Sequence, residues 1–393
     1  MTQALLKKFE KLEDELNTEI FERTQEVHTA VVALLARKHH FQIGPPGTAK
    51  SLSIDRLTKR ISGLGDDGYF RWLLTNYTTP EELFGGPDFM LLREKGIYKR
   101  VTERKMPRAY IAFADEIFKA NSSILNTNLT LMNERLFFNA DDDPKAPLIS
   151  MFAASNELPS GDALWALWDR LHFRHEVAPM QESGSFIRMI SVPMVKDPDP
   201  IVSLDELFKA HAAVDKVEVP AEVFQTVKGL RDDLRKEGIE VTERRWVECT
   251  GIIKAEAWLN GRDVADVEDM RPLMHVLWSD LDHQVVVKKM VLGLANPIDK
   301  EAYDILEKFR GLEYDLNEIV DDGDNVKAIA KQAIEIQKKI MKEKGALNSL
   351  REQQNASGRK SEYLVQAEAK FIQLGKAVMT RGFQVDPDAF KSA

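Results

Sequence analysis

The sequence predicts an α/β protein in which a parallel sheet is flanked by helices, followed by an all-α lid and a helical C-terminal extension. In the first half, apolar segments of strand length alternate with helical segments, which is typical of a parallel sheet covered on both faces. One strand runs into a loop rich in glycine and proline before a helix begins. After Val177 the repeating patterns are helical only. We therefore expect domains at 1–190, 200–295 and 296–393.

The elements follow from the hydrophobic patterns. Residues 1–39 carry two apolar stripes at helical spacing and predict helices. The stretch 78–105 mixes glycine, proline and charge, which favours a loop with short inserted elements. The expected strands are 39–43, 69–75, 109–116 and 148–156.

The rest of the chain is predicted to be helical apart from one linker. Residues 178–202 are interrupted by Gly184 and by prolines and predict that linker, whereas 203–295 carry only helical patterns. From 299 to about 377 the chain is charged and poor in aromatic residues, which predicts roughly three long helices packed as a hairpin or coiled coil.

Composition limits the class of protein. The formal net charge of −9 argues against a chain whose main role is non-specific binding of nucleic acid. Cys249 is the single cysteine, so an internal disulfide is impossible and a reducing, cytoplasmic compartment is expected. The sequence has no signal-peptide pattern and no run of 18 apolar residues, so we expect no membrane span.

The strongest local signal is a phosphate-binding loop between the first strand and the next helix. Such a loop surrounds phosphate oxygens with backbone N–H groups at a helix N-terminus, where the helix dipole is positive. Lys50 is expected to reach the β- and γ-phosphates and Ser51 to coordinate Mg²⁺. Ala49 departs from the usual pattern, which has glycine there. The expected nucleotide-binding residues of the loop are Gly44, Pro45, Pro46, Gly47, Thr48, Ala49, Lys50, Ser51 and Leu52.

Polar side chains end two of the expected strands. Asp115 and Glu116 follow the loop by about 65 residues; Asp115 is expected to hold Mg²⁺ through water and Glu116 to polarise the attacking water. Asn156 could orient that water, although an asparagine at a strand end is by itself usually a turn residue. ATP and Mg²⁺ are therefore the expected cofactors.

Two arginines follow in the segment ALWDRLHFR, at Arg170 and Arg174. A guanidinium supplied to the γ-phosphate of a neighbouring subunit stabilises charge in the transition state. Taken alone, either arginine would be interpreted as a helix-surface residue. The order of the motifs favours an arginine finger instead.

The order of these motifs resembles that of an AAA+ module, and their detailed sequences resemble those of the MoxR family and its RavA-like subfamily. The resemblance spans about 17–295 and rests on EIFERTQEVHTAVVALLARKHHFQIGPPGTAKS, TTPEELFG, YIAFADEIFKANSSILNTNLTLMNER, FAASNELP, ALWDRLHFR and VTERRW. RavA-like proteins share alanine at the position of Ala49. The resemblance makes Lys50 and Ser51 the Walker A pair, Asp115 and Glu116 the Walker B pair, and Asn156 sensor 1.

The resemblance also implies roles for residues outside these motifs. Arg170 becomes the arginine finger, with Arg174 as the alternative. Arg244 becomes the sensor 2 arginine that reaches the γ-phosphate from the lid, with Arg245 as the alternative. Glu22 and Arg23 lie in the stretch that, in such proteins, runs past the adenine.

The family implies a function and partners. MoxR proteins form hexameric rings, act as chaperone-like remodellers, and commonly pair with a protein that carries a von Willebrand factor A (VWA) domain. They carry a helix-2 insert and a pre-sensor-1 hairpin, expected here at 76–105 and 136–147. The C-terminal part departs from RavA proteins, because 299–393 predicts helices and leaves too few residues for their β-rich docking module. Docking to the decarboxylase partner of that subfamily is therefore not expected to carry over.

Two other functions remain open. A nucleic-acid motor is disfavoured by the acidic net charge and by Asp141, Asp142 and Asp143 in the hairpin beside Lys145. An assembly scaffold that binds ATP and scarcely hydrolyses it has no direct support, since both carboxylates are present.

Overall fold

A computed structural model describes residues 2–140, 142–191, 193, 196–321, 326–358 and 361–383. By its packing the chain forms two compact units, 1–287 and 288–393. The three domains predicted from the sequence are a finer division and stay a prediction. Among the described residues, no helix is both long and apolar enough to cross a bilayer.

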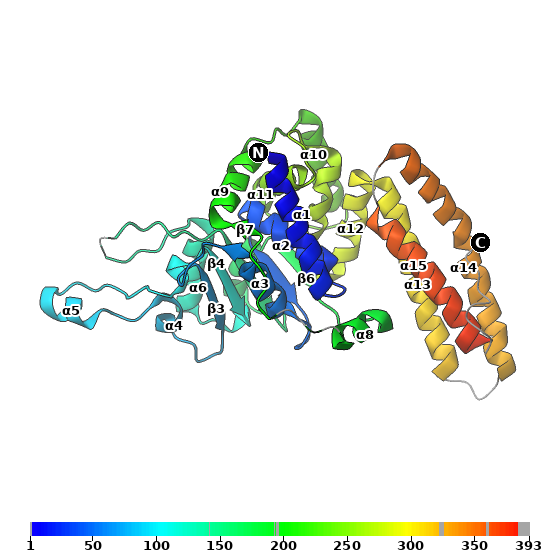
Figure 1. The fold of residues 1–393 in the computed structure, drawn as a ribbon, viewed down its shortest axis with the longest axis horizontal. Helices are drawn as coiled ribbons and strands as arrows, with labels where there is room; N and C mark the ends of the chain where they lie inside the picture. Colours follow the sequence, from blue (N-terminus) through cyan, green and yellow to red (C-terminus); the bar gives the residue numbers. More distant parts are fainter. Residues whose placement is uncertain are drawn as a thin grey trace. The chain divides into compact units, whose positions relative to one another are not determined.

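The first unit is built on a five-stranded parallel sheet with the order β3-β4-β5-β1-β6 (Figure 1). Every residue of β5 is buried, and β4 is buried up to its last residue, as expected for central strands of a covered parallel sheet. The α/β fold class predicted from the sequence is thereby confirmed. The strands are β1 (His40–Ile43), β3 (Tyr69–Leu73), β4 (Ile111–Asp115), β5 (Ser150–Ser155) and β6 (Phe173–Glu176).

Two short parallel strands, β2 (Ile61–Ser62) and β7 (Val202–Ser203), form a second sheet. Helix α2 packs against β1 and β6, and α3 packs against β4 and β5. The helices of this part are α1 (Thr2–Glu19), α2 (Thr24–Ala36), α3 (Lys50–Lys59), α6 (Ser122–Asn133), α7 (Asp162–Arg170), α9 (Leu204–Asp215), α10 (Ala221–Lys236) and α11 (Glu243–Leu259). Three single-turn or 3-10 segments accompany them, η1 (Met106–Arg108), η2 (Ile117–Lys119) and η3 (Val267–His275).

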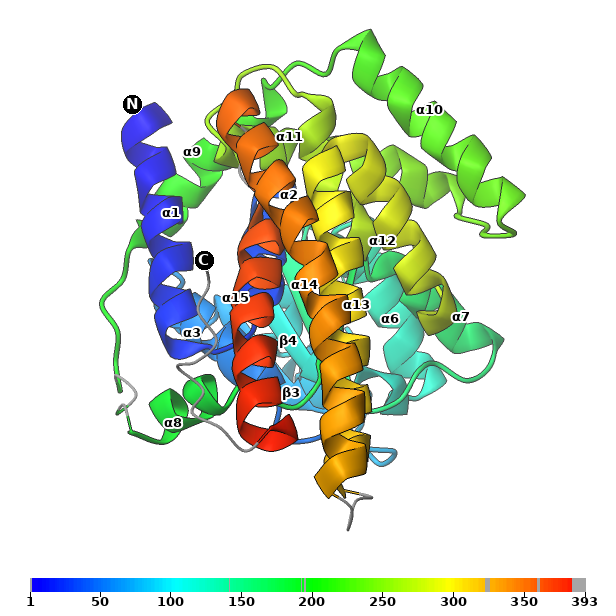
Figure 2. The same cartoon turned by 90° about the vertical axis from the view of Figure 1, so that its right-hand side faces the viewer.

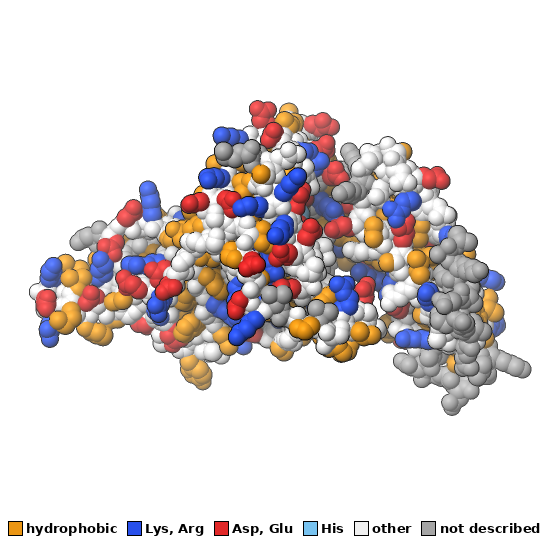
Figure 3. Space-filling model, viewed as in Figure 1, with side chains coloured by type: hydrophobic (Ala, Val, Ile, Leu, Met, Phe, Trp, Pro, Cys, Tyr) orange, Lys and Arg blue, Asp and Glu red, His pale blue; other side chains and the backbone are white. Residues whose placement is uncertain are grey.

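The stretch 178–202, predicted as a linker, contains a helix, α8 (Ser183–Ser191). None of its residues is buried, and four large apolar side chains are exposed on it (Figure 3). A short helix without a buried stripe lacks the usual sequence signal, which explains why the pattern suggested a linker. Those four side chains are Phe186, Ile187, Met189 and Ile190.

Two insertions extend from the sheet beside β3 and β4 (Figure 1). The first contains α4 (Pro80–Phe84) and α5 (Phe89–Lys95), and the second is a hairpin closed by an antiparallel bridge between Leu136 and Lys145. The Asn139 side chain accepts from the Arg100 N–H at 2.7 Å and donates to the Arg100 carbonyl at 3.0 Å. The two insertions therefore touch. Asp141, predicted in the hairpin tip, lies outside the described residues.

The second unit is a bundle of long helices, which run side by side in both cartoon views (Figures 1 and 2). The hydroxyl of Ser361 donates to Asp299 Oδ1 at 2.5 Å, and Lys308 forms an ion pair with Glu343 at 3.0 Å. The described residues of this unit contain no strand, in agreement with the predicted helical extension. Its helices are α13 (Pro297–Asp321), α14 (Val326–Ser357), α15 (Glu362–Ala377) and η4 (Val378–Gly382), and the boundary between the units falls within α12 (Leu281–Ala295).

Candidate active site

The register of the sheet brings three segments to one edge. Ile43 at the end of β1 lies opposite Ser155 of β5, and Asp115 at the end of β4 lies opposite Ala154. The carboxyl ends of neighbouring parallel strands share one edge of a sheet, which is where ligands bind in such folds. The glycine–proline loop after β1, the carboxylates after β4 and Asn156 after β5 therefore meet there.

The loop after β1 needs particular backbone conformations. A Cβ added to Gly44 would lie 2.2 Å from the carbonyl oxygen of Val177, so no other residue fits at this close approach. Gly47 has a φ of 81°. Ala49 has a φ of 63°, in the left-handed region that favours glycine, and directly precedes α3. The structure thus shows why glycine is usual at the position of Ala49 and that alanine adopts the same conformation.

Lys50, the first residue of α3, is buried and turns back over the loop. Its Nζ donates to the carbonyls of Gly44 at 2.6 Å and Pro45 at 2.8 Å, and to Asn156 Oδ1 at 3.2 Å. Burial lowers the pKa of Lys50, partly offset by the negative charges of Asp115 and Glu116. An ammonium held at the N-terminus of a helix beside open backbone N–H groups suits a bound phosphate.

Glu116 follows β4 in the left-handed conformation, with a φ of 53°. Its side chain is buried, and its two oxygens have different partners. Asn156 donates its amide Nδ2 to Oε1, and the ammonium of Lys119 lies 3.3 Å from Oε2. Since Asn156 also accepts from Lys50, one asparagine joins the loop lysine to this carboxylate.

Residues that could hold a magnesium ion lie beside this chain of contacts. Ser51 stands half-buried in the first turn of α3, and Asp115 ends β4 with its Oδ1 accepting from the Glu116 N–H at 3.1 Å. Within the described ranges, no group of three or more His, Cys, Asp and Glu side chains could hold a metal. A hydroxyl and one carboxylate fit Mg²⁺, which takes few protein ligands and completes its shell with water and phosphate oxygens.

Glu22 and Arg23 lie beside the segment that follows β6. Glu22 accepts from the backbone N–H groups of Gln181 at 2.8 Å and Glu182 at 2.9 Å, and Arg23 donates to the Ala178 carbonyl. That segment begins at Val177, whose carbonyl touches Gly44. The stretch predicted to pass the adenine is therefore next to the loop predicted to bind phosphate.

The two arginines of ALWDRLHFR have different surroundings. Arg174 lies on β6, fully buried, and donates to the carbonyls of Leu171 at 3.0 Å and Trp168 at 2.6 Å. Arg170 ends α7 and is half-buried; its Nη1 donates to the Ala166 carbonyl of the same helix at 2.5 Å, and its Nε is buried without a hydrogen-bond partner. Burial lowers the pKa of Arg170, and the positive charge of Arg244 lowers it further. The contacts of Arg174 keep it inside the unit, whereas Arg170 remains partly accessible; its role as an arginine finger stays a prediction.

The two arginines of TERRW divide in the same way. Arg245 is buried and donates to the carbonyls of Val276 at 2.8 Å and Asp169 at 3.0 Å; burial lowers its pKa to about 10. Arg244 is exposed and lies 3.4 Å from Asp169 Oδ2. The structure therefore groups Arg244 with Arg170, and it does not place Arg244 among the contacts of Lys50 and Glu116 described above.

Comparison with known proteins identifies the chain. Residues 7–189 match the MoxR domain in the MoxR-vWA-beta-propeller ternary systems, and residues 222–291 match an AAA lid domain. The uncharacterized protein MJ0079 of Methanocaldococcus jannaschii is 35% identical over 315 residues, which cover 80% of this chain and 82% of that protein. The chain belongs to the MoxR family of AAA+ ATPases.

Two further similarities agree with the MoxR assignment. The uncharacterized protein MJ0812 of the same organism is 34% identical over 346 residues, which cover 87% of this chain and 88% of that protein. The solved structure of a candidate ATPase from Cytophaga hutchinsonii has a TM-score of 0.58 and 17% identity, and covers 75% of this chain and 96% of that one. This second similarity shows the fold alone. Membership of the RavA-like subfamily stays a prediction.

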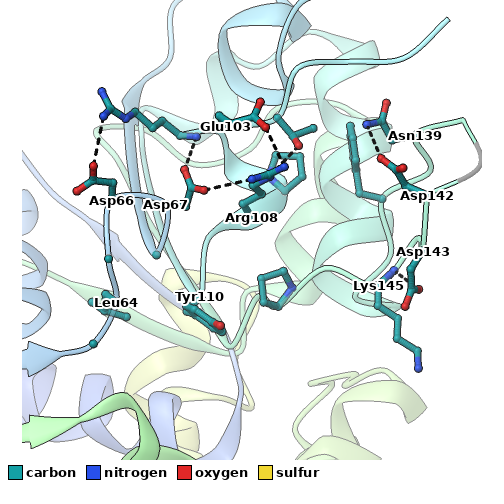
Figure 4. Close-up of a pocket in the computed structure, with 18 residues that line it drawn as sticks. Leu64, Asp66, Asp67, Glu103, Arg108, Tyr110, Asn139, Asp142, Asp143 and Lys145 are labelled. Carbon is teal, nitrogen blue, oxygen red and sulfur yellow. Dashed lines mark hydrogen bonds and ion pairs between the residues drawn. The ribbon is translucent and has the colours of Figure 1, made fainter. Parts of the chain in front are cut away.

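A separate cleft of about 780 Å³ lies at the base of the two MoxR insertions (Figure 4). Its charged side chains are largely paired, with Arg108 contacting Asp67 at 3.4 Å and Glu103 at 3.0 Å. None of the residues predicted to bind nucleotide lines it. The cleft is therefore distinct from the site at the sheet edge.

Sequence reasoning missed two residues that contact the site. Lys119 lies three residues after Glu116, and a lysine at the end of one helical turn carried no separate signal. Val177 directly follows β6, and its carbonyl oxygen leaves room for no side chain on residue 44. The strand β6 was not predicted because its four residues include arginine, histidine and glutamate and resemble the end of a helix.

Proposed function

We propose that this protein is an ATPase that works as a ring of identical subunits and uses ATP hydrolysis to remodel or mature a partner protein complex. The observation that carries the proposal is the continuous set of contacts from Lys50 through Asn156 to Glu116 at the edge of the sheet. It joins a phosphate-binding lysine to a carboxylate that can accept a proton from water. Membership of the MoxR family of AAA+ ATPases supports the same function.

Each residue has a defined part in this reaction. The loop N–H groups and Lys50 bind the β- and γ-phosphates, while Ser51 and, through water, Asp115 would hold Mg²⁺, which would neutralise charge on the phosphate oxygens. Glu116 accepts the proton of the attacking water, and Asn156 orients that water toward the phosphorus. Phosphate would replace the loop carbonyls as the partner of Lys50. Glu22 and Arg23 bind the adenine side.

Completion of the site by a second subunit would give a role to Arg170 and Arg244. Arg170 is half-buried, with its Nη1 on the Ala166 carbonyl, and the exposed Arg244 contacts the carboxylate of Asp169. A guanidinium delivered to the γ-phosphate contributes about 10³–10⁵-fold to turnover in related phosphoryl transfers. We infer that Arg170 acts as the finger on the neighbouring subunit, in a ring for which six members is the family expectation. Arg244 acts as sensor 2.

The partners follow from the family description. The matching domain belongs to systems that combine MoxR, VWA and β-propeller proteins. We propose that a VWA-domain protein, and with it a β-propeller protein, presents the client to this ATPase in the cytoplasm. Chaperone-like remodelling of that client is the expected outcome, and no observation favours nucleic acid as the substrate.

Steady-state ATP hydrolysis, measured against protein concentration with light scattering in the same samples, tests the proposal. Specific activity is expected to rise as a ring appears. Glu116→Gln should still bind ATP and assemble, with turnover reduced by about 100-fold or more. Glu222→Gln, an exposed carboxylate on α10, is the matched control and should behave as the native protein. A native protein that stays monomeric and inactive at every concentration would contradict the proposal, and assembly without turnover would favour the scaffold.

A further inference from the structure

Lys119 contacts the candidate site without belonging to any of its motifs. It ends the single turn η2 that follows Glu116. Its Nζ lies 3.3 Å from Glu116 Oε2, whereas Oε1 accepts from Asn156. The carboxylate is therefore held on both oxygens by different side chains.

We propose that Lys119 is a positioning residue for the catalytic carboxylate, which fixes the orientation of Glu116 so that its free lone pairs face the attacking water. The inference rests on the proposed ATPase function. It adds a residue that acts on the reaction through Glu116 and contacts neither the nucleotide nor the metal.

The position of Lys119 is fixed by backbone and core contacts of its turn that do not involve its own side chain. Its N–H donates to the Glu116 carbonyl at 2.9 Å, which closes the turn. Ile117 and Phe118 anchor the turn in the core, and the ring of Phe118 lies 5.3 Å from that of Phe41 on β1. A lysine held three residues after the carboxylate in this turn needs little further ordering to reach it.

Charge gives a reason for a cation at this position. Glu116 is only 9% exposed, and a buried carboxylate is costly unless it is paired and hydrogen-bonded. Lys50 also interacts electrostatically with Glu116, but in the proposed reaction Lys50 is engaged by phosphate. Lys119 then remains as the cation that balances Glu116. Its side chain is 39% exposed, so the ammonium reaches the carboxylate from the solvent side.

Replacement of Lys119 separates positioning from binding. Lys119→Met should lower kcat by about 10- to 100-fold, because small displacements of a catalytic group have effects of this size. KM for ATP and ring assembly should remain close to native, since the residues that bind phosphate are untouched. Lys119→Arg, which keeps the charge, should restore most of kcat.

Two controls show whether the effect passes through Glu116. Lys308→Met removes a half-exposed lysine from an ion pair of similar length in the other unit and should leave kcat unchanged. In a Glu116→Gln background, adding Lys119→Met should produce no further loss, because residues that act as a unit are not additive. An independent role for Lys119 would instead give a second full loss.

The outcomes distinguish this inference from the proposed function. If the native protein turns over ATP and Glu116→Gln abolishes turnover, while Lys119→Met keeps the native kcat, the positioning role is wrong and the ATPase stands. A loss of kcat that Lys119→Arg fails to restore, together with a lowered melting temperature, would also overturn it in favour of a structural role. A native protein without turnover overturns both.

Discussion

The edge of the sheet and the region where α7 meets α11 organise their charged side chains differently. At the sheet edge, Lys50, Asn156 and Glu116 contact one another directly. Near α7 and α11 each pair of arginines is divided, and the buried member of each pair donates to backbone carbonyls of its own unit. Of the other members, Arg244 is exposed and Arg170 is half-buried, with one hydrogen bond from its Nη1 to the Ala166 carbonyl of its own helix.

This difference indicates which region can work alone. A lysine, an amide and a carboxylate in mutual contact form a site that one chain completes for binding. Arg170 is half-buried at the end of α7 and Arg244 is exposed, so theirs are the guanidinium groups in this region that a group outside the chain could reach. We infer that the sheet edge binds and activates, while the arginine region completes a site elsewhere.

The largest expected effect is on turnover, and mixing a variant of each region tests whether the two regions act from different subunits. Arg170→Ala and Glu116→Gln should each lower turnover by about 100-fold or more, for different reasons. In mixed rings, a subunit that keeps Glu116 can receive Arg170 from a neighbour that carries Glu116→Gln, so mixing two inactive proteins should restore part of the activity. Turnover is measured across mixing ratios. An inactive mixture that has demonstrably exchanged subunits would place Arg170 outside the site.

The free energy of unfolding should depend more on the buried Arg174 than on Arg170, although Arg170 is the residue expected to matter for turnover. Arg174→Ala removes a guanidinium that lies 3.9 Å from the centre of the Trp168 ring and leaves several buried carbonyls without a donor, so we expect a loss of about 3 kcal/mol or more. Arg170→Ala should cost less than about 1 kcal/mol. Urea unfolding followed by tryptophan fluorescence reports on this region, since Trp168 and Trp278 are buried there. Equal losses for the two variants would remove the distinction between structural and exposed arginines.

The sequence could predict the meeting of residues at the sheet edge, because Glu116 and Asn156 directly follow apolar strands and Lys50 follows the loop that leaves the first strand. Once the strands are parallel, their carboxyl ends share one edge, and Lys50, Glu116 and Asn156 must come close. The fold class was predictable for the same reason. The catalytic and binding roles of these residues stay predictions.

The local pattern could not predict the choice within each arginine pair, and the expectation of Arg170 and Arg244 came from the family resemblance alone. Arg174 is buried because Trp278, more than a hundred residues later, supplies part of its surroundings. Adjacent or near-adjacent arginines have the same local pattern, so only distant contacts decide which of them is enclosed. Lys119 was missed for a related reason, since its partner depends on a left-handed turn at Glu116 that no apolar pattern encodes.

A smaller effect on stability is expected from His28, which contacts α11, the helix that also carries Arg244 and Arg245. His28 lies between Glu256 of α11 and Glu13 of α1; burial alone would lower its pKa, but these two carboxylates raise it well above the usual 6.5. A raised pKa in the folded state means that this stabilisation is complete below about pH 6.5 and disappears as pH rises through the folded-state pKa.

His28→Gln should therefore cost about 1 kcal/mol at pH 6 and progressively less at higher pH. Melting temperatures of the native protein and the variant, compared at pH 6 and pH 9, measure this. The gap should narrow at pH 9. A constant gap would mean that His28 contributes by packing and that its charge has no part in holding α11.

The smallest effect concerns the backbone of the phosphate-binding loop. Ala49 in the left-handed region is strained by about 1 kcal/mol, and Ala49→Gly relieves this strain but adds freedom to the unfolded chain of similar size. The net change in stability should stay within about 1 kcal/mol, with nucleotide binding kept. Gly44→Ala is the contrasting variant, because its Cβ would collide with the Val177 carbonyl and should disrupt the loop. If Ala49→Gly instead abolished binding, the alanine side chain would have a role beyond its conformation. A small effect would mean that the sheet edge tolerates changes that preserve its backbone conformation and rejects those that displace it.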